Sequence, residues 1–262
     1  MRALLAGLEQ AGKLAAFETT VALQPSNWYI RLMPQALKTE LLRRAYDLPQ
    51  SKVNTRFLRE LVRLTAPRLR AGFLTAHETG WASIDSVYRD LDHYVAKRLI
   101  AAWQNFPICA VYGYEDGALN TFRAAKQVGV KCFYELPIGY WRVGQRIQEE
   151  EAYLNPEWAP TLTAQFDSEA KLADKDEELQ LADAIFVASR FTQQTLQAAP
   201  PVSAPVLVIP YGAPFPSLRY KAKHLGKLRV LFVGSLGQRK GICYLLEAIQ
   251  KLGAQVELTL IG

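Results

Sequence analysis

Strands and helices alternate along the second half of the chain, and this rhythm limits the possible folds more than any other feature of the sequence. The predicted strands cover residues 108–112, 131–136, 184–188 and 206–209. The predicted helices run up to residue 128, over 167–181 and up to residue 198. Strands that alternate with helices form a mostly parallel sheet with helices on both faces. The sequence therefore predicts a Rossmann-like α/β fold.

The first hundred residues are less regular. We expect an amphipathic helix over 2–11, a strand over 17–23, a mainly helical region over 34–69 and a long helix over 84–105. Half of the 262 residues are hydrophobic, which is enough for a sizeable core. The first helix is broken by polar residues and does not resemble a secretory signal, and no apolar run approaches the ~20 residues of a membrane span. These observations favour a cytoplasmic protein.

Residues 228–262 repeat the pattern on a smaller scale. An apolar run ends at Val233, Gly234 follows, and leucine and isoleucine then recur at helical spacing before a second apolar run. This order predicts a βαβ unit. A helix that begins near Gly241 directs its free N–H groups toward the preceding loop, where Lys240 adds a cation. The loop is predicted to hold a diphosphate, although many strand-to-helix loops carry a glycine and a lysine without binding one.

Three motifs together resemble a known enzyme family. The segment from 232 to 248 follows the pattern FVGSLxxxKGxxxLLEA, residues 178–192 are ELQLADAIFVASRFT, and residues 208–213 are VIPYGA. Their order and spacing resemble those of GT-B glycosyltransferases, in particular family 4, also called glycosyl transferases group 1. The likeness runs from about Cys109 to the end of the chain. It implies transfer of a sugar from a nucleotide-sugar donor to a sugar, lipid or other hydroxyl acceptor, without a metal or a cofactor.

The resemblance also implies where the donor binds. In this family backbone amides and a basic pair hold the diphosphate of the donor, and here the matching residues are Gly234, Ser235, Arg239, Lys240 and Gly241. The family commonly has an arginine where this chain has Ser235, so Arg239 is either its replacement or a solvent-facing loop charge.

Acceptor-side candidates follow the predicted strands, because ligands of parallel sheets gather at the carboxyl ends of the strands. They are Tyr114, Glu115, Glu135, Tyr140, Trp141, Arg142 and Ser189. Tyr140 and Trp141 are either a stacking platform for a sugar ring or buried loop aromatics, and Glu135 or Arg142 are candidates to bind hydroxyl groups. Many relatives have a histidine where Tyr114 stands, so no catalytic residue is assigned.

The resemblance further implies a domain division and two cut ends. Residues 1–213 are expected to form an acceptor-side N-terminal domain that lacks its first strand, and residues 214–227 a linker. Residues 228–262 are expected to be the truncated start of the C-terminal nucleotide-sugar-binding domain. One alternative is a non-catalytic remnant that acts as a binding or partner subunit. Another is an epimerase or phosphorylase on the same fold.

Charge and cysteine content restrict the partners. The net charge is +6, and residues 31–70 hold ten basic side chains against three acidic ones. This basic region either contacts an anionic membrane or steers an anionic substrate, or it is an ordinary solvated surface. No nucleic-acid-binding motif is present, so nucleic acid is not an expected partner. Cys109, Cys132 and Cys243 lack metal-ligand spacing and are expected to be reduced, with the first two as core thiols in strands.

Overall fold

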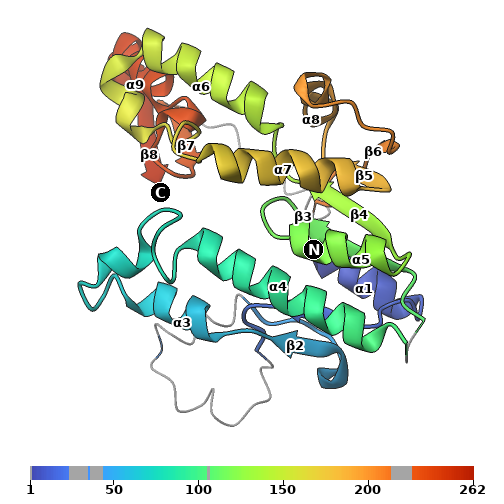
Figure 1. Cartoon of the computed structure of the whole chain (residues 1–262). Coiled ribbons are helices and arrows are strands. Elements are labelled where there is room, and N and C mark those ends of the chain that lie inside the picture. Colours follow the sequence, from blue (N-terminus) through green and yellow to red (C-terminus); the bar gives the residue numbers. More distant parts are fainter. Residues whose placement is uncertain (1, 24–34, 36–43, 105–106, 214–225) are drawn as a thin grey trace. The chain divides into compact units, whose positions relative to one another are not determined.

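The computed structural model describes residues 2–23, 35, 44–104, 107–213 and 226–262 (Figure 1). The chain divides into two compact units, which are described separately. Unit 1 comprises Met1–Ile138, Glu169–Arg190 and Pro200–Gly212, and unit 2 comprises Gly139–Ser168, Phe191–Ala199 and Ala213–Gly262. Most of the predicted linker, residues 214–225, lies outside the described residues.

Unit 1 is built on a four-stranded sheet in which all neighbouring strands are parallel. Its order is β3 (Ala110–Tyr114), β4 (Lys131–Leu136), β5 (Ala184–Val187) and β6 (Val206–Val208). The register places Tyr114 opposite Glu135. The predicted α/β class with a parallel sheet is confirmed, and the predicted strands match within two residues at each end.

Three helices pack in unit 1 near this sheet. They are α4 (Ile84–Ala102), α5 (Leu119–Gln127) and α7 (Glu169–Leu181), and α5 contacts both α4 and α7 as well as β4 (Figure 1). The core here contains Phe122 of α5 and Tyr134, Leu136 and Ile185 of the strands, all at most 1% exposed. Burial of these large side chains is the main stabilising contribution to unit 1.

The first part of unit 1 contains short elements. They are α1 (Arg2–Gln10), β1 (Phe17–Thr19), η2 (Gln50–Lys52), β2 (Val53–Thr55), α3 (Leu58–Thr65) and η3 (Gly72–Thr75). Strands β1 and β2 pair in parallel. The prediction of a helical region over 34–69 is wrong at β2, because Pro49 ends any helix before it and β-branched residues follow. Residues 34 and 36–43 of that region lie outside the described residues.

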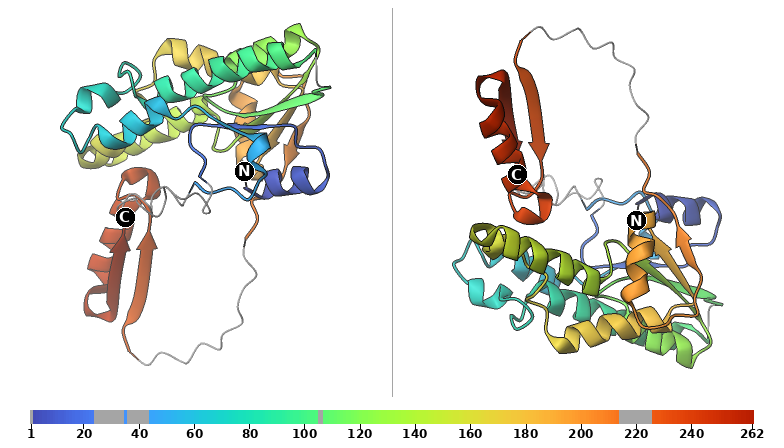
Figure 2. Two further views of the ribbon diagram at one scale, coloured as in Figure 1. Left: turned by 90° about the horizontal axis from the view of Figure 1, so that it is seen from below. Right: turned by 90° about the horizontal axis from the view of Figure 1, so that it is seen from above.

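Unit 2 contains the predicted βαβ unit. Strands β7 (Leu228–Val233) and β8 (Val256–Ile261) pair in parallel, and α9 (Ile242–Leu252) lies alongside them in both views of Figure 2. The loop before α9 includes η6 (Gln238–Lys240), and η7 (Gly253–Gln255) follows the helix. The other elements are α6 (Trp141–Leu154), η4 (Pro156–Thr161), η5 (Leu196–Ala198) and most of α8 (Arg190–Thr195).

All three cysteines are free. Cys132 in β4 and Cys243 in α9 are buried, whereas Cys109 is exposed because β3 begins one residue later, at Ala110. The prediction of a core thiol is therefore wrong for Cys109. Among the described residues, no helix combines the length and apolar character needed to cross a bilayer.

Candidate functional site

A buried carboxylate surrounded by tyrosines lies where β3 and β4 end. Glu135 is 7% exposed, and its Oε2 accepts a 2.5 Å hydrogen bond from the hydroxyl of Tyr112. Its Oε1 accepts a 3.1 Å hydrogen bond from the hydroxyl of Tyr211, which follows β6. Tyr114 stands opposite Glu135 in the register of β3 and β4. We call these four residues, Tyr112, Tyr114, Glu135 and Tyr211, the tyrosine–glutamate cluster.

The cluster keeps its hydroxyl groups protonated. Burial raises the pKa of Tyr112 and of Tyr114 far above the usual value. The neighbouring Glu135 carboxylate, which accepts a hydrogen bond from Tyr112, raises it further. The pKa of Tyr211 is raised in the same direction, first by burial and then by the charge of Glu135. At neutral pH the three tyrosines therefore keep their hydroxyl protons, and Tyr112 and Tyr211 donate theirs to one carboxylate.

One member of the cluster is open to solvent. Tyr211 is 59% exposed, whereas Tyr112 and Tyr114 are half-buried and their rings meet edge to face at 6.1 Å. A carboxylate oxygen that bonds only to an exposed hydroxyl can exchange that partner for the hydroxyl of a ligand. The cluster therefore offers one exchangeable hydroxyl position at the strand ends, where parallel sheets bind their ligands.

The loop that follows Tyr114 is held by two carboxylates from neighbouring helices. Glu178 of α7 accepts the N–H groups of Asp116, Ala118 and Leu119 at 2.9, 2.8 and 3.0 Å. Asp92 of α4 accepts those of Asn120 and Thr121 at 2.7 and 2.8 Å.

These bonds cap the N-terminus of α5 and fix the turn after β3. The backbone at Asp116 adopts a left-handed φ of 70° in this turn. The capped turn thereby positions Tyr114 and Glu115 at the strand end.

The remaining acceptor-side candidates are distributed over both units. Ser189 is half-buried just beyond β5 in unit 1. Tyr140, Trp141 and Arg142 begin α6 in unit 2. Tyr140 is only 1% exposed, and the guanidinium of Arg142 lies 4.3 Å from the ring centre of Trp141. The structure thus joins Tyr114 to Glu135, whereas a stacking role for Trp141 stays a prediction.

The predicted diphosphate loop connects β7 to α9. Gly234 follows the strand with φ 151°, and Gly241 precedes the helix in the left-handed conformation with φ 68°. Both values favour glycine because a side chain would be strained there. Ser235, Arg239 and Lys240 are exposed in this loop, and neither basic side chain forms an ion pair within the described part of the chain. The loop therefore presents two cations beside a helix N-terminus.

Gln238 anchors this loop within unit 2. Its amide Nε2 donates to Glu151 at 2.6 Å, and its backbone N–H donates to the hydroxyl of Thr161 at 2.9 Å. Its Oε1 accepts the N–H of Cys243, in the first turn of α9, at 3.1 Å. These bonds hold Gln238 inward and leave Arg239 and Lys240 exposed. They also occupy the N–H of Cys243, which is one of the donors at the start of α9.

Sequence reasoning missed Tyr112, Tyr211 and Glu178. The alternation of a strand places Tyr112 on the same face as Tyr114, and this signal was available. Tyr211 stands two residues after the predicted strand end at 209, so the strand-end rule applied to VIPYGA also indicates it. No sequence signal pairs Glu178 with a loop about 60 residues away.

Comparisons with known proteins add one distant likeness. No protein-family model and no curated protein matches the chain. A similar solved structure is that of Phytolacca americana UGT2 complexed with UDP-2fluoro-glucose and pterostilbene. The two share 15% sequence identity with a TM-score of 0.45, and the match covers 94% of this chain and 71% of that chain.

Proposed function

We propose that the chain is a glycosyltransferase of the GT-B fold and family 4, or a part of one, that transfers a sugar from a nucleotide-sugar donor to a hydroxyl acceptor. The tyrosine–glutamate cluster is the observation that carries the proposal. It combines a carboxylate and three tyrosine hydroxyl groups at and near the ends of parallel strands, which suits a ligand rich in hydroxyl groups.

Glu135 has a defined task in this proposal. The acceptor hydroxyl displaces the hydroxyl of Tyr211 and donates its hydrogen bond to Oε1 of Glu135, while Tyr112 keeps Oε2 occupied. A carboxylate held in this way orients the acceptor oxygen and draws its proton away during attack on the sugar. Burial strengthens the contact, because water does not compete for the carboxylate.

The loop from Gly234 to Gly241 has the donor-binding task. Lys240 and Arg239 are exposed cations beside the N-terminus of α9, and two glycines let the backbone come close to a ligand. A diphosphate leaving group gains negative charge as the sugar bond breaks, and fixed cations and N–H groups stabilise that charge. The sequence motif FVGSLxxxKGxxxLLEA supports the same assignment.

The proposal is tested by release of nucleoside diphosphate from a panel of UDP-, GDP-, ADP- and dTDP-hexoses, with and without octyl glycosides as acceptors. Release is expected to be faster with an acceptor present. Glu135→Gln is expected to slow it by ~10²-fold, because one fixed catalytic contact is usually worth that much. The matched control is Glu177→Gln, which changes an exposed carboxylate on α7 paired with Arg123. Equal rates for the two variants would contradict the role of Glu135.

A further inference from the structure

Helix α3 presents part of its apolar side to solvent and its acidic residue to the interior. Glu60 is 3% exposed and accepts hydrogen bonds from Arg44 and Arg63 at 2.5 and 2.7 Å. Leu58 is 60% and Leu61 43% exposed, whereas Val62 and Leu64 are half-buried. A surface helix ordinarily buries its apolar stripe. Part of the apolar stripe of α3 therefore faces solvent.

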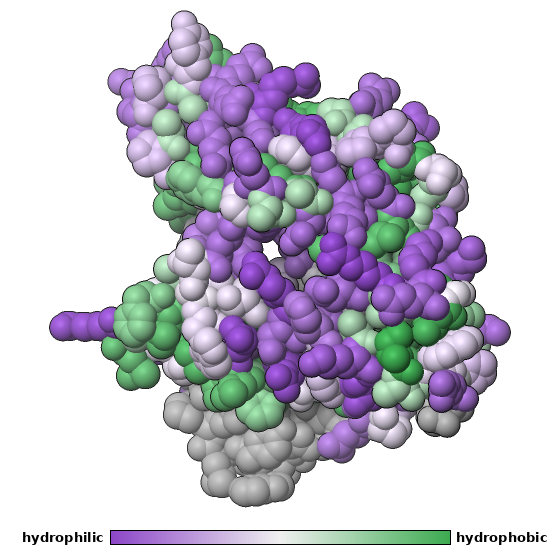
Figure 3. All heavy atoms as spheres, viewed as in Figure 1, coloured by the Kyte–Doolittle hydropathy of each residue, from purple (hydrophilic) through white to green (hydrophobic). Residues whose placement is uncertain are grey.

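Further apolar side chains are exposed around this helix. Figure 3 shows them gathered over α3 and the turn that follows it. Those on the segments before and after α3 are Phe57, Leu69, Phe73, Trp81, Ile84 and Tyr88, each more than 40% exposed. An accumulation of this size on a soluble unit marks an interaction site.

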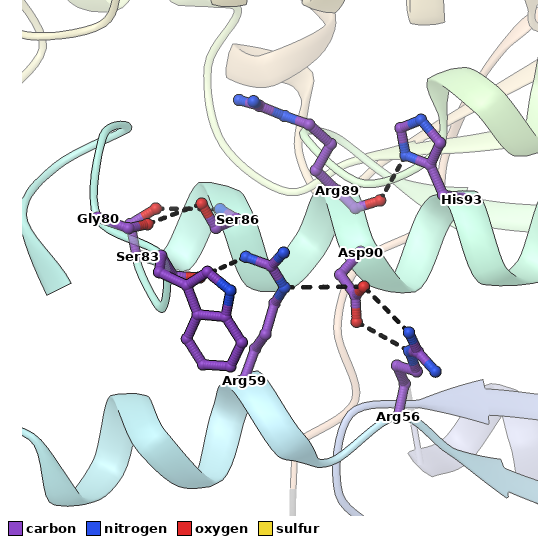
Figure 4. A network of polar contacts seen from close by, with 9 residues as sticks. Arg56, Arg59, Gly80, Ser83, Ser86, Arg89, Asp90 and His93 are labelled. Carbon is purple, nitrogen blue, oxygen red and sulfur yellow. Dashed lines mark hydrogen bonds and ion pairs between the residues drawn. The ribbon is translucent and has the colours of Figure 1, made fainter. Parts of the chain in front are cut away.

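The acidic side chains near this surface are buried or paired. Each acidic residue between 56 and 93 is at most 21% exposed; these residues are Glu60, Glu78, Asp85, Asp90 and Asp92. Figure 4 shows Asp90 between Arg56 and Arg59, at 2.9 and 3.7 Å from their nearest nitrogens. Arg59 also donates to the carbonyl of Trp81 and lies over its ring.

Two arginines that follow α3 remain uncompensated. Arg68 and Arg70 are exposed, and neither forms an ion pair with a residue in the described ranges. Arg68 donates to a backbone carbonyl of α3 at 2.6 Å, which keeps its stem against the helix. The exposed surface therefore combines large apolar groups with positive charge and almost no negative charge.

We propose that this surface docks the protein onto a bilayer that contains anionic phospholipids. We name it the α3 surface and define it by its apolar and basic members: Phe57, Leu58, Leu61, Leu69, Phe73, Trp81, Arg68 and Arg70. Apolar side chains on a short helix enter the boundary between headgroups and acyl chains, and the guanidinium groups contact lipid phosphates. The docking does not depend on the proposed glycosyl transfer.

Charge complementarity is the reason for choosing a lipid surface over another protein. Guanidinium groups interspersed with protruding apolar groups match the layered chemistry of an anionic bilayer, whose phosphates lie directly above its hydrocarbon. Each basic residue near such a surface strengthens binding by roughly fivefold. The two uncompensated arginines together therefore account for roughly 25-fold in the partition coefficient.

The test is sedimentation of the full chain with vesicles of phosphatidylcholine alone or mixed with phosphatidylglycerol. We expect binding to the mixed vesicles, weakening at high salt. The double change Arg68→Gln with Arg70→Gln is expected to weaken binding by roughly 25-fold. The control removes equal charge elsewhere, through Arg146→Gln with Arg190→Gln, and is expected to weaken binding far less.

A second pair of variants isolates the apolar contribution. Leu61→Ser with Phe73→Ser is expected to weaken vesicle binding by at least ~10-fold, because both side chains leave water on docking. Tyr153→Ser, at an exposed site in unit 2, is the control. All these side chains are partly or fully exposed, so the variants are expected to fold, which circular dichroism verifies. Equal binding to both vesicle types, unchanged binding of the Arg68 and Arg70 double variant, or self-association without vesicle binding would overturn the proposal.

Discussion

Removal of the Glu178 side chain is expected to destabilise unit 1 strongly. This carboxylate accepts three backbone N–H groups, and those of Ala118 and Leu119 are buried with it. A buried donor left without an acceptor costs about 1–3 kcal/mol. For Glu178→Ala the two buried donors alone predict a loss of about 2–6 kcal/mol in the free energy of unfolding.

Urea unfolding followed by circular dichroism measures this loss. Glu177→Ala is the matched control, because the neighbouring glutamate forms only an exposed ion pair with Arg123, worth about 0–1 kcal/mol. Glu178→Gln keeps one acceptor oxygen and is expected to lose less than Glu178→Ala. A loss below about 1 kcal/mol for Glu178→Ala, with an unchanged urea dependence, would refute the assigned role of the cap.

The same residue makes stability depend on pH. Burial raises the pKa of Glu178 to about 8 from its usual 4.5, while its backbone donors act in the opposite direction. Between these values the native state holds a proton that the unfolded chain has released, so the stabilisation is present at low pH and is lost as the pH rises through the folded value. The wild-type free energy of unfolding is expected to fall by up to ~1.4 kcal/mol per pH unit between about pH 5 and 8. This slope is expected to be smaller in Glu178→Ala.

Three further outcomes are expected. Asp183→Asn should cost about 1 kcal/mol at pH 7, because contacts with two lysines and a backbone N–H hold the pKa of Asp183 down to about 2 despite partial burial. That contribution is present above pH 3.8 and lost as the pH falls toward 2, so wild type and variant should converge in urea unfolding at acid pH. Lys240→Ala should weaken binding of nucleoside diphosphates by ~10²-fold in calorimetric titration, whereas Lys251→Ala in the last turn of α9 should change it less than threefold. Residues 228–262 should exchange amide hydrogens faster than β4, because β7 and β8 have exposed edges and apolar residues; equally slow exchange in both would contradict this.

The strands of unit 1 could be predicted because each is a compact apolar or aromatic run between turn residues. The observed bounds of β4 are the predicted ones, and α4 begins at the predicted residue, where Ser83 caps it. Helix α6 was not predicted. Half of its residues have charged or amide side chains, and none of its residues is buried. The contacts of α6 with Gln238 and Tyr244 are hydrogen bonds. Hydrophobic periodicity in a sequence reveals only helices that pack through apolar side chains.

The candidate site was also predicted only in part, but the reason differs from that for α6. Tyr114 and Glu135 were both predicted as strand-end residues, because that rule depends only on where each strand stops. Tyr211 meets Glu135 across 76 residues of sequence, and the pairing depends on the order of four strands in the sheet. A single sequence contains no direct signal for that order. The tyrosine–glutamate cluster therefore became visible only with the topology.

The two carboxylates that cap α5 also restrict what unit 1 can recognise. In many α/β proteins the first N–H groups of a helix after a strand bind a phosphate. Here Glu178 and Asp92 accept the N–H groups of residues 118–121, so no donor of that helix end is left for an anion. The strand ends around Glu135 are therefore expected to favour uncharged, hydroxyl-bearing molecules over phosphorylated ones.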